Sequence, residues 1–128
     1  DAFPGETVVE KGLARTYDNL RKAYDMGITI TIGSDSFSFV TPYGYVTIDE
    51  MYDFVEKVGI SILDTVAAAT YNGAKMLGKE NEFGAVKEGL SADILVVKGD
   101  VANNIRDLTP ENMDVIMKEG KIIDRGSF

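Results

Sequence analysis

Histidine, cysteine and tryptophan are absent from the 128 residues, and proline occurs only three times. Without cysteine the chain has no disulfide framework and no thiolate chemistry. Histidine is the commonest metal ligand and the commonest general base near neutral pH, so its absence removes both of those groups from the chain itself. Any chemistry must therefore depend on carboxylates, lysine, tyrosine or hydroxyl side chains, or on residues of another chain.

Positive charge is also scarce. The 13 lysines and arginines face 21 aspartates and glutamates, which gives a formal net charge of −8. An acidic chain is a poor partner for nucleic acids and anionic membranes, because both attract basic surfaces. No apolar stretch approaches the roughly 20 residues needed to cross a bilayer, and the first residues lack the pattern of a signal peptide. These absences favour a cytoplasmic protein without a nucleic-acid or membrane partner.

Two common families of motif are missing as well. Neither GxGxxG nor GxxxxGK[ST] occurs, so the glycines form no phosphate-binding fingerprint. Ser34 and Ser36 have no histidine to activate them, which excludes a serine hydrolase triad within the chain.

The first part of the chain predicts a helix followed by a strand. Apolar residues recur at helical spacing between residues 13 and 24, and Gly27 can end that helix. Isoleucines then alternate with threonines, which predicts a strand over residues 28–33. Glycine and proline predict a loop over residues 33–46.

Helices are expected again after this loop. Thr47 and Glu50 have the spacing of a capping box and predict a helix that begins there and ends at Gly59. Ser61 predicts the start of a second helix, and a third, short helix is expected around residues 74–77.

The last 50 or so residues change character, with short β-like runs separated by glycines. The segment MDVIMKEGKIIDRG predicts a hairpin that turns at Glu119-Gly120. The fold class is therefore α/β, with a mostly α/β part at residues 1–80 and a mostly β part at residues 81–128.

Asp35 is the main candidate for chemistry, since it follows directly after the predicted strand. In a (β/α)8 barrel, catalytic groups lie at the carboxyl ends of the strands. A carboxylate there can bind a divalent cation or accept a proton from a metal-activated water. The alternative is an Asx turn or a helix cap. Tyr43 and Tyr45, in the same loop, could line a substrate pocket or pack the loop against the barrel.

Other acidic residues have simpler explanations. Asp49 with Glu50, and Asp124, could form paired carboxylates, but capping a helix and solvating a hairpin account for them. Asp93 is expected to accept hydrogen bonds from backbone donors near the start of its strand.

Several motifs occur in a particular order: GITITIGSDS, TPYG, GISILDTVAAATYNGAKMLG, FGAVKEGLSADILVVKGD and VIMKEGKII. From about residue 5 to 126, this set resembles the C-terminal part of the amidohydrolase superfamily, especially its imidazolonepropionase-like and prolidase-like (Xaa-Pro dipeptidase) members. The resemblance implies the last strand and helices of a (β/α)8 barrel, followed by strands of the family's small composite β-sandwich.

The resemblance also implies roles for particular residues. Residues 28–33 would be the eighth barrel strand. Asp35 would match the aspartate of the family's Gly-Thr-Asp, with Ser34 in place of threonine. In the family that aspartate ligates the metal and accepts a proton from the attacking water. Residues 62–71 would match an alanine-rich segment that ends in Ala-Thr.

Some family features are missing from this sequence. Tyr43 stands where relatives often have histidine, and the family's His-x-His, its bridging lysine or glutamate and its later histidines have no counterpart. The resemblance therefore implies the last third or so of an enzyme. That enzyme would be a metal-dependent hydrolase of C–N bonds in a small amide, peptide or cyclic amide, with zinc as the default metal.

Two expectations follow for the chain alone. It should bind no metal and be inactive, because Asp35 is its one plausible ligand. It should also self-associate, or associate with the missing N-terminal part, because an isolated barrel strand leaves its edges unpaired. Apolar helix faces should then be exposed, at Leu13, Leu20, Phe54 and Val58. The alternative function is a non-catalytic α/β module that acts in binding or assembly.

Overall fold

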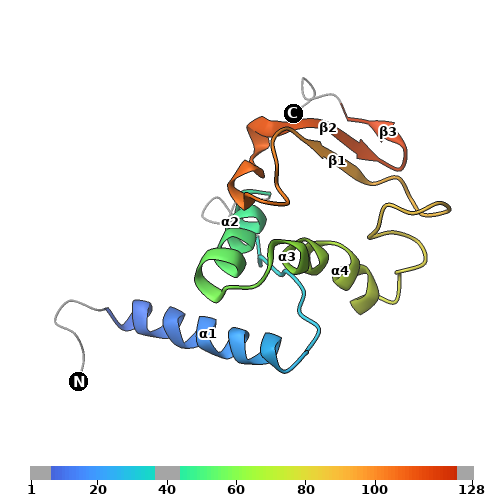
Figure 1. Cartoon of the computed structure of the whole chain (residues 1–128). Helices are drawn as coiled ribbons and strands as arrows, with labels where there is room; N and C mark the ends of the chain where they lie inside the picture. The colour runs from blue at the N-terminus through green and yellow to red at the C-terminus, as the bar shows by residue number, and fades with distance from the viewer. Residues whose placement is uncertain (1–6, 37–43, 124–128) are drawn as a thin grey trace.

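The computed structural model describes residues 7–36 and 44–123. The helices of the first part are α1 (Val8–Asp25), α2 (Tyr45–Asp53), the π-helix η1 (Phe54–Val58), α3 (Ile62–Ala69) and α4 (Tyr71–Met76). The second part contains the strands β1 (Ile94–Val97), β2 (Met113–Lys118) and β3 (Lys121–Ile122), and the 3-10 turns η2 (Ile105–Asp107) and η3 (Pro110–Asn112). The sheet and α1 lie at opposite ends of the molecule, with the other helices between them (Figure 1).

The helix predicted between residues 13 and 24 is confirmed as α1. A capping box opens it: the Thr7 hydroxyl accepts a hydrogen bond from the Glu10 N–H, and the Glu10 carboxylate accepts one from the Thr7 N–H. Gly27, with a φ of 75°, follows its end as predicted.

Residues 28–33 form no strand, so that prediction is wrong for this chain. A strand exists only when its backbone pairs with a neighbour, and the strands of residues 7–36 and 44–123 all belong to the C-terminal sheet. Helices supply two of the hydrogen bonds instead. The Ile32 N–H donates to the Ala68 carbonyl (3.2 Å), and the Asn72 side-chain amide donates to the Ile30 carbonyl (2.9 Å).

The predicted capping box at Thr47 and Glu50 is also wrong. Helix α2 begins two residues earlier, at Tyr45, and follows Gly44, whose φ of 83° few other residues adopt. Thr47 and Glu50 consequently lie inside the helix, and their side chains are free to contact the segment around Asp35. Gly59 ends the helical stretch as predicted, with a φ of 79°.

The two following helices agree with the sequence patterns. The Ser61 hydroxyl caps α3 by accepting a hydrogen bond from the Asp64 N–H (3.1 Å). Helix α4 covers the region around residues 74–77 and is followed by Gly78, which has a positive φ.

The C-terminal strands form an antiparallel sheet in the order β1-β2-β3. The predicted hairpin is confirmed: Lys118 pairs with Lys121, and Glu119 (φ 51°) and Gly120 (φ 78°) form the two-residue turn. The Asp93 carboxylate accepts a hydrogen bond from the Glu119 N–H (2.7 Å), as expected for a residue that satisfies backbone donors. The Lys118 ammonium binds the same carboxylate (2.5 Å) and lowers the pKa of Asp93.

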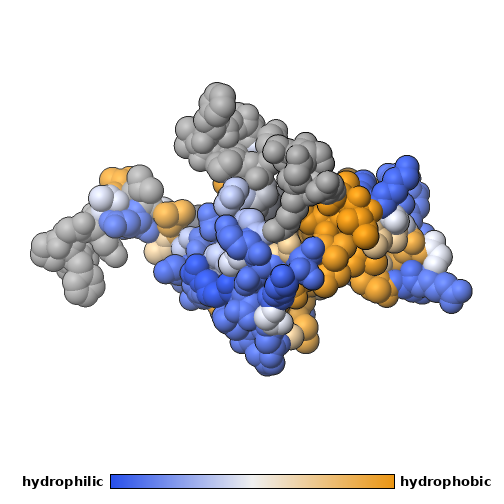
Figure 2. All heavy atoms as spheres, turned by 90° about the horizontal axis from the view of Figure 1, so that it is seen from above, coloured by the Kyte–Doolittle hydropathy of each residue, from blue (hydrophilic) through white to orange (hydrophobic). Residues whose placement is uncertain are grey.

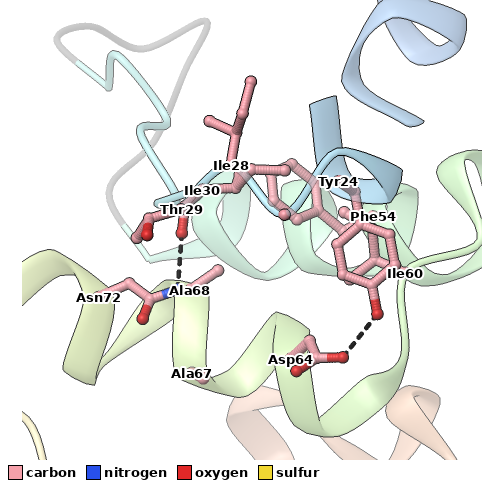
Figure 3. A pocket seen from close by; sticks show the side chains of 11 residues that line it. Tyr24, Ile28, Thr29, Ile30, Phe54, Ile60, Asp64, Ala67, Ala68 and Asn72 are labelled. Carbon is pink, nitrogen blue, oxygen red and sulfur yellow. Dashed lines mark hydrogen bonds between the residues drawn. The ribbon is translucent and has the colours of Figure 1, made fainter. Parts of the chain in front are cut away.

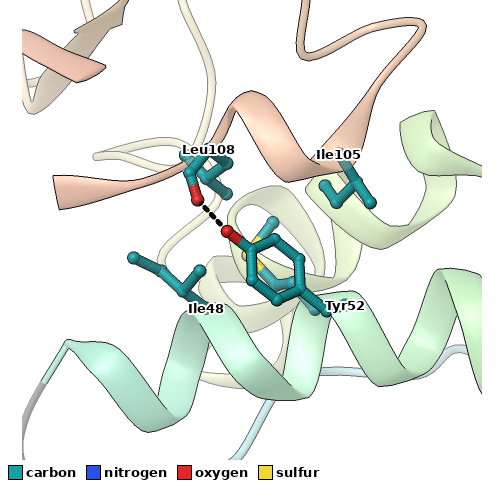
Figure 4. Close-up of a cluster of buried hydrophobic side chains, with 5 residues drawn as sticks. Ile48, Tyr52, Ile105 and Leu108 are labelled. Carbon is teal, nitrogen blue, oxygen red and sulfur yellow. Dashed lines mark hydrogen bonds between the residues drawn. The ribbon is translucent and has the colours of Figure 1, made fainter. Parts of the chain in front are cut away.

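One buried cluster joins α2 to the region before β2. It contains Ile48, Met51, Tyr52, Ile105 and Leu108 (Figure 4). The Tyr52 hydroxyl donates a hydrogen bond to the Leu108 carbonyl (2.5 Å), and the Arg106 guanidinium lies 4.1 Å from the centre of the Tyr52 ring. The division between residues 1–80 and 81–128 stays a prediction, and this core includes residues from both sides of it.

A second cluster lies between α1, η1 and α3, and contains Phe54, Val58, Ile60 and Ala68. Phe54 and Val58 are each only 5% exposed, so the expectation that their face would be open is wrong. Side chains of α1, among them Leu20, pack against this face and bury it. The sequence patterns did not predict this contact. Leu13, one turn beyond the contact, is 48% exposed, as expected.

The sheet keeps apolar side chains on its surface. A hydrophobic patch lies over the strands in the view from above (Figure 2). Exposed apolar residues of the sheet include Leu95, Val96 and Ile122. No helix within the described ranges is both long enough and apolar enough to cross a membrane.

Candidate functional site

Segment 28–36 contacts α4 at Ile30 and α3 at Ile32. Asp35 follows these contacts, in the last four residues of the segment (33–36), which we call the tip. Its side chain is exposed to solvent. Its backbone has a φ of 48°, which is the left-handed region that few residues other than glycine, asparagine and aspartate enter. The structure therefore presents the Asp35 carboxylate on a sharply turned, exposed part of the chain.

Helix α2 contacts the two residues of the tip that precede Asp35. The Gly33 N–H donates to both oxygens of the Glu50 carboxylate, at 3.2 and 3.4 Å. The Thr47 hydroxyl donates to the Ser34 hydroxyl (3.3 Å), and the hydroxyls of Ser34 and Ser36 share a hydrogen bond of 2.9 Å.

Glu50 was assigned only a capping role by the sequence, and its contact with the tip was missed. Burial raises the pKa of the Glu50 carboxyl, the hydrogen bond from Gly33 opposes that rise, and the charge of Asp53 adds to it. The available signal was the spacing of Thr47 and Glu50, because residues three apart lie on one face of a helix. Only the true start of α2 shows that this face meets the tip.

The structure describes only some of the other predicted site residues. Tyr43 and Asp124 lie outside the described residues. Tyr45 is the first residue of α2 and is 56% exposed. Its expected place in a substrate pocket stays a prediction.

A metal site must be assembled from several ligands, typically about three or four from the protein. Across residues 7–36 and 44–123, no three or more histidine, cysteine, aspartate or glutamate residues are grouped so that they could hold a metal ion. The described residues therefore do not fit a complete metal centre by themselves.

A pocket of about 240 Å3 opens beside the start of the segment 28–36 (Figure 3). Several of its polar side chains have partners within the protein: the Tyr24 hydroxyl donates to the Asp64 carboxylate (2.6 Å), and the Asn72 amide donates to the Ile30 carbonyl. Hydrogen bonds from Ser61 and Tyr24 lower the pKa of Asp64. Ile28, Phe54, Ile60 and neighbouring residues make the remaining lining largely apolar. Such a pocket offers packing surface rather than an acid–base pair.

Comparison with known proteins gives one consistent result. The model of the amidohydrolase family matches residues 7–123. The chain is 30% identical over 91 residues to an imidazolonepropionase of Thermoanaerobacter pseudethanolicus, which covers 71% of this chain and 21% of that protein. It is also 30% identical over 116 residues to adenine deaminase 4 of Rhizobium meliloti, covering 83% of this chain and 18% of that protein.

Solved structures agree with the sequence relatives. A Xaa-Pro dipeptidase with methionine bound in its active site superposes with a TM-score of 0.73 and 32% identity, over 84% of this chain and 25% of that one. A candidate prolidase from Bifidobacterium longum gives a TM-score of 0.78 and 27% identity, over 94% of this chain and 30% of that one. The chain thus spans about a fifth of these curated relatives and between a quarter and a third of these structures.

Proposed function

Because the chain belongs to the amidohydrolase family, we propose that it is the C-terminal part of a metal-dependent hydrolase that cleaves C–N bonds. The family match over residues 7–123 carries this proposal. The substrate would be a small molecule with an amide, peptide or cyclic amide bond. Relatives named imidazolonepropionase, adenine deaminase and Xaa-Pro dipeptidase support an enzyme of this class.

Asp35 is the residue of this chain that we propose for the active site. It would supply one carboxylate ligand to a divalent metal, zinc by default, whose other ligands come from outside residues 1–128. The exposure of its side chain and its place at the tip support this role, because a ligand must be open to the rest of the site. Such a metal lowers the pKa of a bound water to about 7 and polarises a carbonyl group.

A proton acceptor is also needed when water attacks a carbonyl carbon. We assign that step to a carboxylate oxygen of Asp35, which would need to approach the water to hydrogen-bond distance. Tyr43 and Tyr45 would line the substrate pocket, since they flank the beginning of the helix that follows the tip. Residues 1–80 would belong to the barrel and residues 81–128 to the β-sandwich.

The purified chain of residues 1–128 should carry no stoichiometric zinc and should hydrolyse no dipeptide. The reason is that one exposed carboxylate cannot hold zinc tightly without further ligands. Elemental analysis after dialysis measures the metal, and amine release from dipeptides measures the activity. About one tightly bound metal ion per chain would contradict the proposal that the other metal ligands lie outside residues 1–128.

The same chain should self-associate unless its N-terminal partner is present. Segment 28–33 has no strand neighbour within the described residues, and Ile28, its first residue, is 53% exposed. Sedimentation velocity at micromolar concentration should detect dimers or larger species. Ile28→Lys should shift the chain towards monomer, whereas Val86→Lys, at a position 87% exposed, should not. A monomer of the unchanged chain at every concentration would contradict this prediction.

A further inference from the structure

The left-handed backbone conformation of Asp35 has to be stabilised by other residues. A left-handed conformation at a residue other than glycine costs free energy, and it persists only where the surroundings impose it. Asp35 has a φ of 48° and an exposed side chain, so packing around its own side chain does not supply the constraint. Interactions of the neighbouring tip residues therefore have to stabilise the conformation of Asp35.

Helix α2 provides these interactions through the face that contains Thr47 and Glu50. Glu50 accepts the Gly33 N–H with both carboxylate oxygens, two residues before Asp35. One turn earlier, Thr47 donates to the Ser34 hydroxyl, which in turn bonds to the Ser36 hydroxyl across Asp35. The contact of Glu50 is the stronger of the two, because a hydrogen bond to a charged acceptor is worth more than one between neutral groups.

The position of α2 is itself fixed. Ile48, Met51 and Tyr52 are buried on the face that packs against Ile105 and Leu108 (Figure 4). Glu50 is therefore attached to a helix that is anchored in a core, and it can transmit that rigidity to the tip.

We propose that Glu50 is a positioning residue for Asp35: by binding the Gly33 N–H, it fixes the turn that directs the Asp35 carboxylate into the active site. This inference rests on the proposed function of Asp35. It adds a residue that touches neither metal nor substrate and that acts through the backbone of the tip. Thr47 supports the same turn through Ser34.

Two variants of Glu50 separate the hydrogen bond from the rest of the side chain. Glu50→Met keeps a long, helix-compatible side chain and removes the acceptor, whereas Glu50→Gln keeps one acceptor oxygen. Asp49→Ala is the matched control, because it removes an exposed carboxylate from the adjacent position of α2.

Amide hydrogen exchange, followed by NMR on residues 1–128, tests the contact without any metal. Glu50→Met should accelerate exchange at Gly33 by roughly tenfold, since it removes a bond to a charged acceptor. Glu50→Gln should retain most of the protection, and Asp49→Ala should retain all of it. Exchange of the amides within α2 shows whether each variant is folded. Unchanged exchange at Gly33 in folded Glu50→Met would overturn the inference.

Kinetics of the chain joined to its N-terminal part test the consequence. Glu50→Met should lower kcat by about tenfold to a hundredfold, the effect of a misplaced catalytic group, and leave KM nearly unchanged. Glu50→Gln should restore most of kcat. Equal losses in both variants, or no loss in Glu50→Met, would overturn the positioning role. Full activity of Asp35→Ala would instead overturn the proposed function, while the exchange result at Gly33 would stand.

Discussion

Asp35→Ala should abolish turnover by the complete enzyme, with a loss of about three or more orders of magnitude in kcat. The substitution would remove the proposed ligand and the proposed proton acceptor together, and within the described residues Asp35 belongs to no group of three or more potential metal ligands that could replace it. The fold should survive, because the side chain is exposed. The measurement needs residues 1–128 joined to the N-terminal part in which the family resemblance places His-x-His. Steady-state kinetics and metal content then give the effect.

Asp93→Ala is the control for that experiment. Asp93 is an aspartate in another part of the chain, and its carboxylate accepts hydrogen bonds from Lys118 and from the Glu119 N–H in the C-terminal hairpin. Its loss should lower stability and leave kcat within about twofold, as for a change remote from the chemistry. The role of Asp35 would be refuted by near-complete activity of its alanine variant.

Phe54→Ala should destabilise the chain by about 3–5 kcal/mol, a large part of the roughly 5–15 kcal/mol that stabilises an ordinary domain. Phe54 is 5% exposed and lies in the cluster that joins α1, η1 and α3. Truncation of its ring would leave a cavity that the surrounding helices cannot close. Urea unfolding, followed by circular dichroism, gives the free energy of unfolding.

Two further substitutions calibrate this result. Ile60→Val removes a single methylene from the same cluster and should cost about 0.5–1.5 kcal/mol. Val86→Ala changes a residue that is 87% exposed and should stay within about 0.5 kcal/mol of the original chain. A loss below about 1 kcal/mol for Phe54→Ala would show that this cluster is not packed in solution.

Sequence patterns predicted correctly those structural elements that depend on interactions between residues close together in the chain. The helical spacing before Gly27 and the Ser61 cap predicted α1 and α3, and Glu119-Gly120 predicted the hairpin. Each of these features is decided by hydrogen bonds or backbone conformation within a few residues, so the sequence contains the necessary information.

Features that depend on distant partners were predicted less well. Residues 28–33 have a strand-like pattern but no strand beside them. Thr47 and Glu50 fit a capping box, yet Gly44 starts the helix earlier. The burial of Phe54 depends on α1, which is some 30 residues away along the chain. The role of Asp35 stays a prediction, because it requires further metal ligands and the described residues form no group that could hold a metal ion.

The core formed around Tyr52 also limits how such a protein can change during evolution. Tyr52 and Ile48 belong to the helical part, whereas Ile105 and Leu108 belong to the part that precedes β2, and they bury one another. A recombination event that exchanged the region after residue 80 between two relatives would bring together side chains not selected to fit. The hydrogen bond from the Tyr52 hydroxyl to the Leu108 carbonyl would survive such an exchange. Its acceptor is a backbone carbonyl, which every residue at position 108 offers as long as the backbone stays in place. The packing of the apolar side chains would not survive it, so they are expected to be inherited as a set.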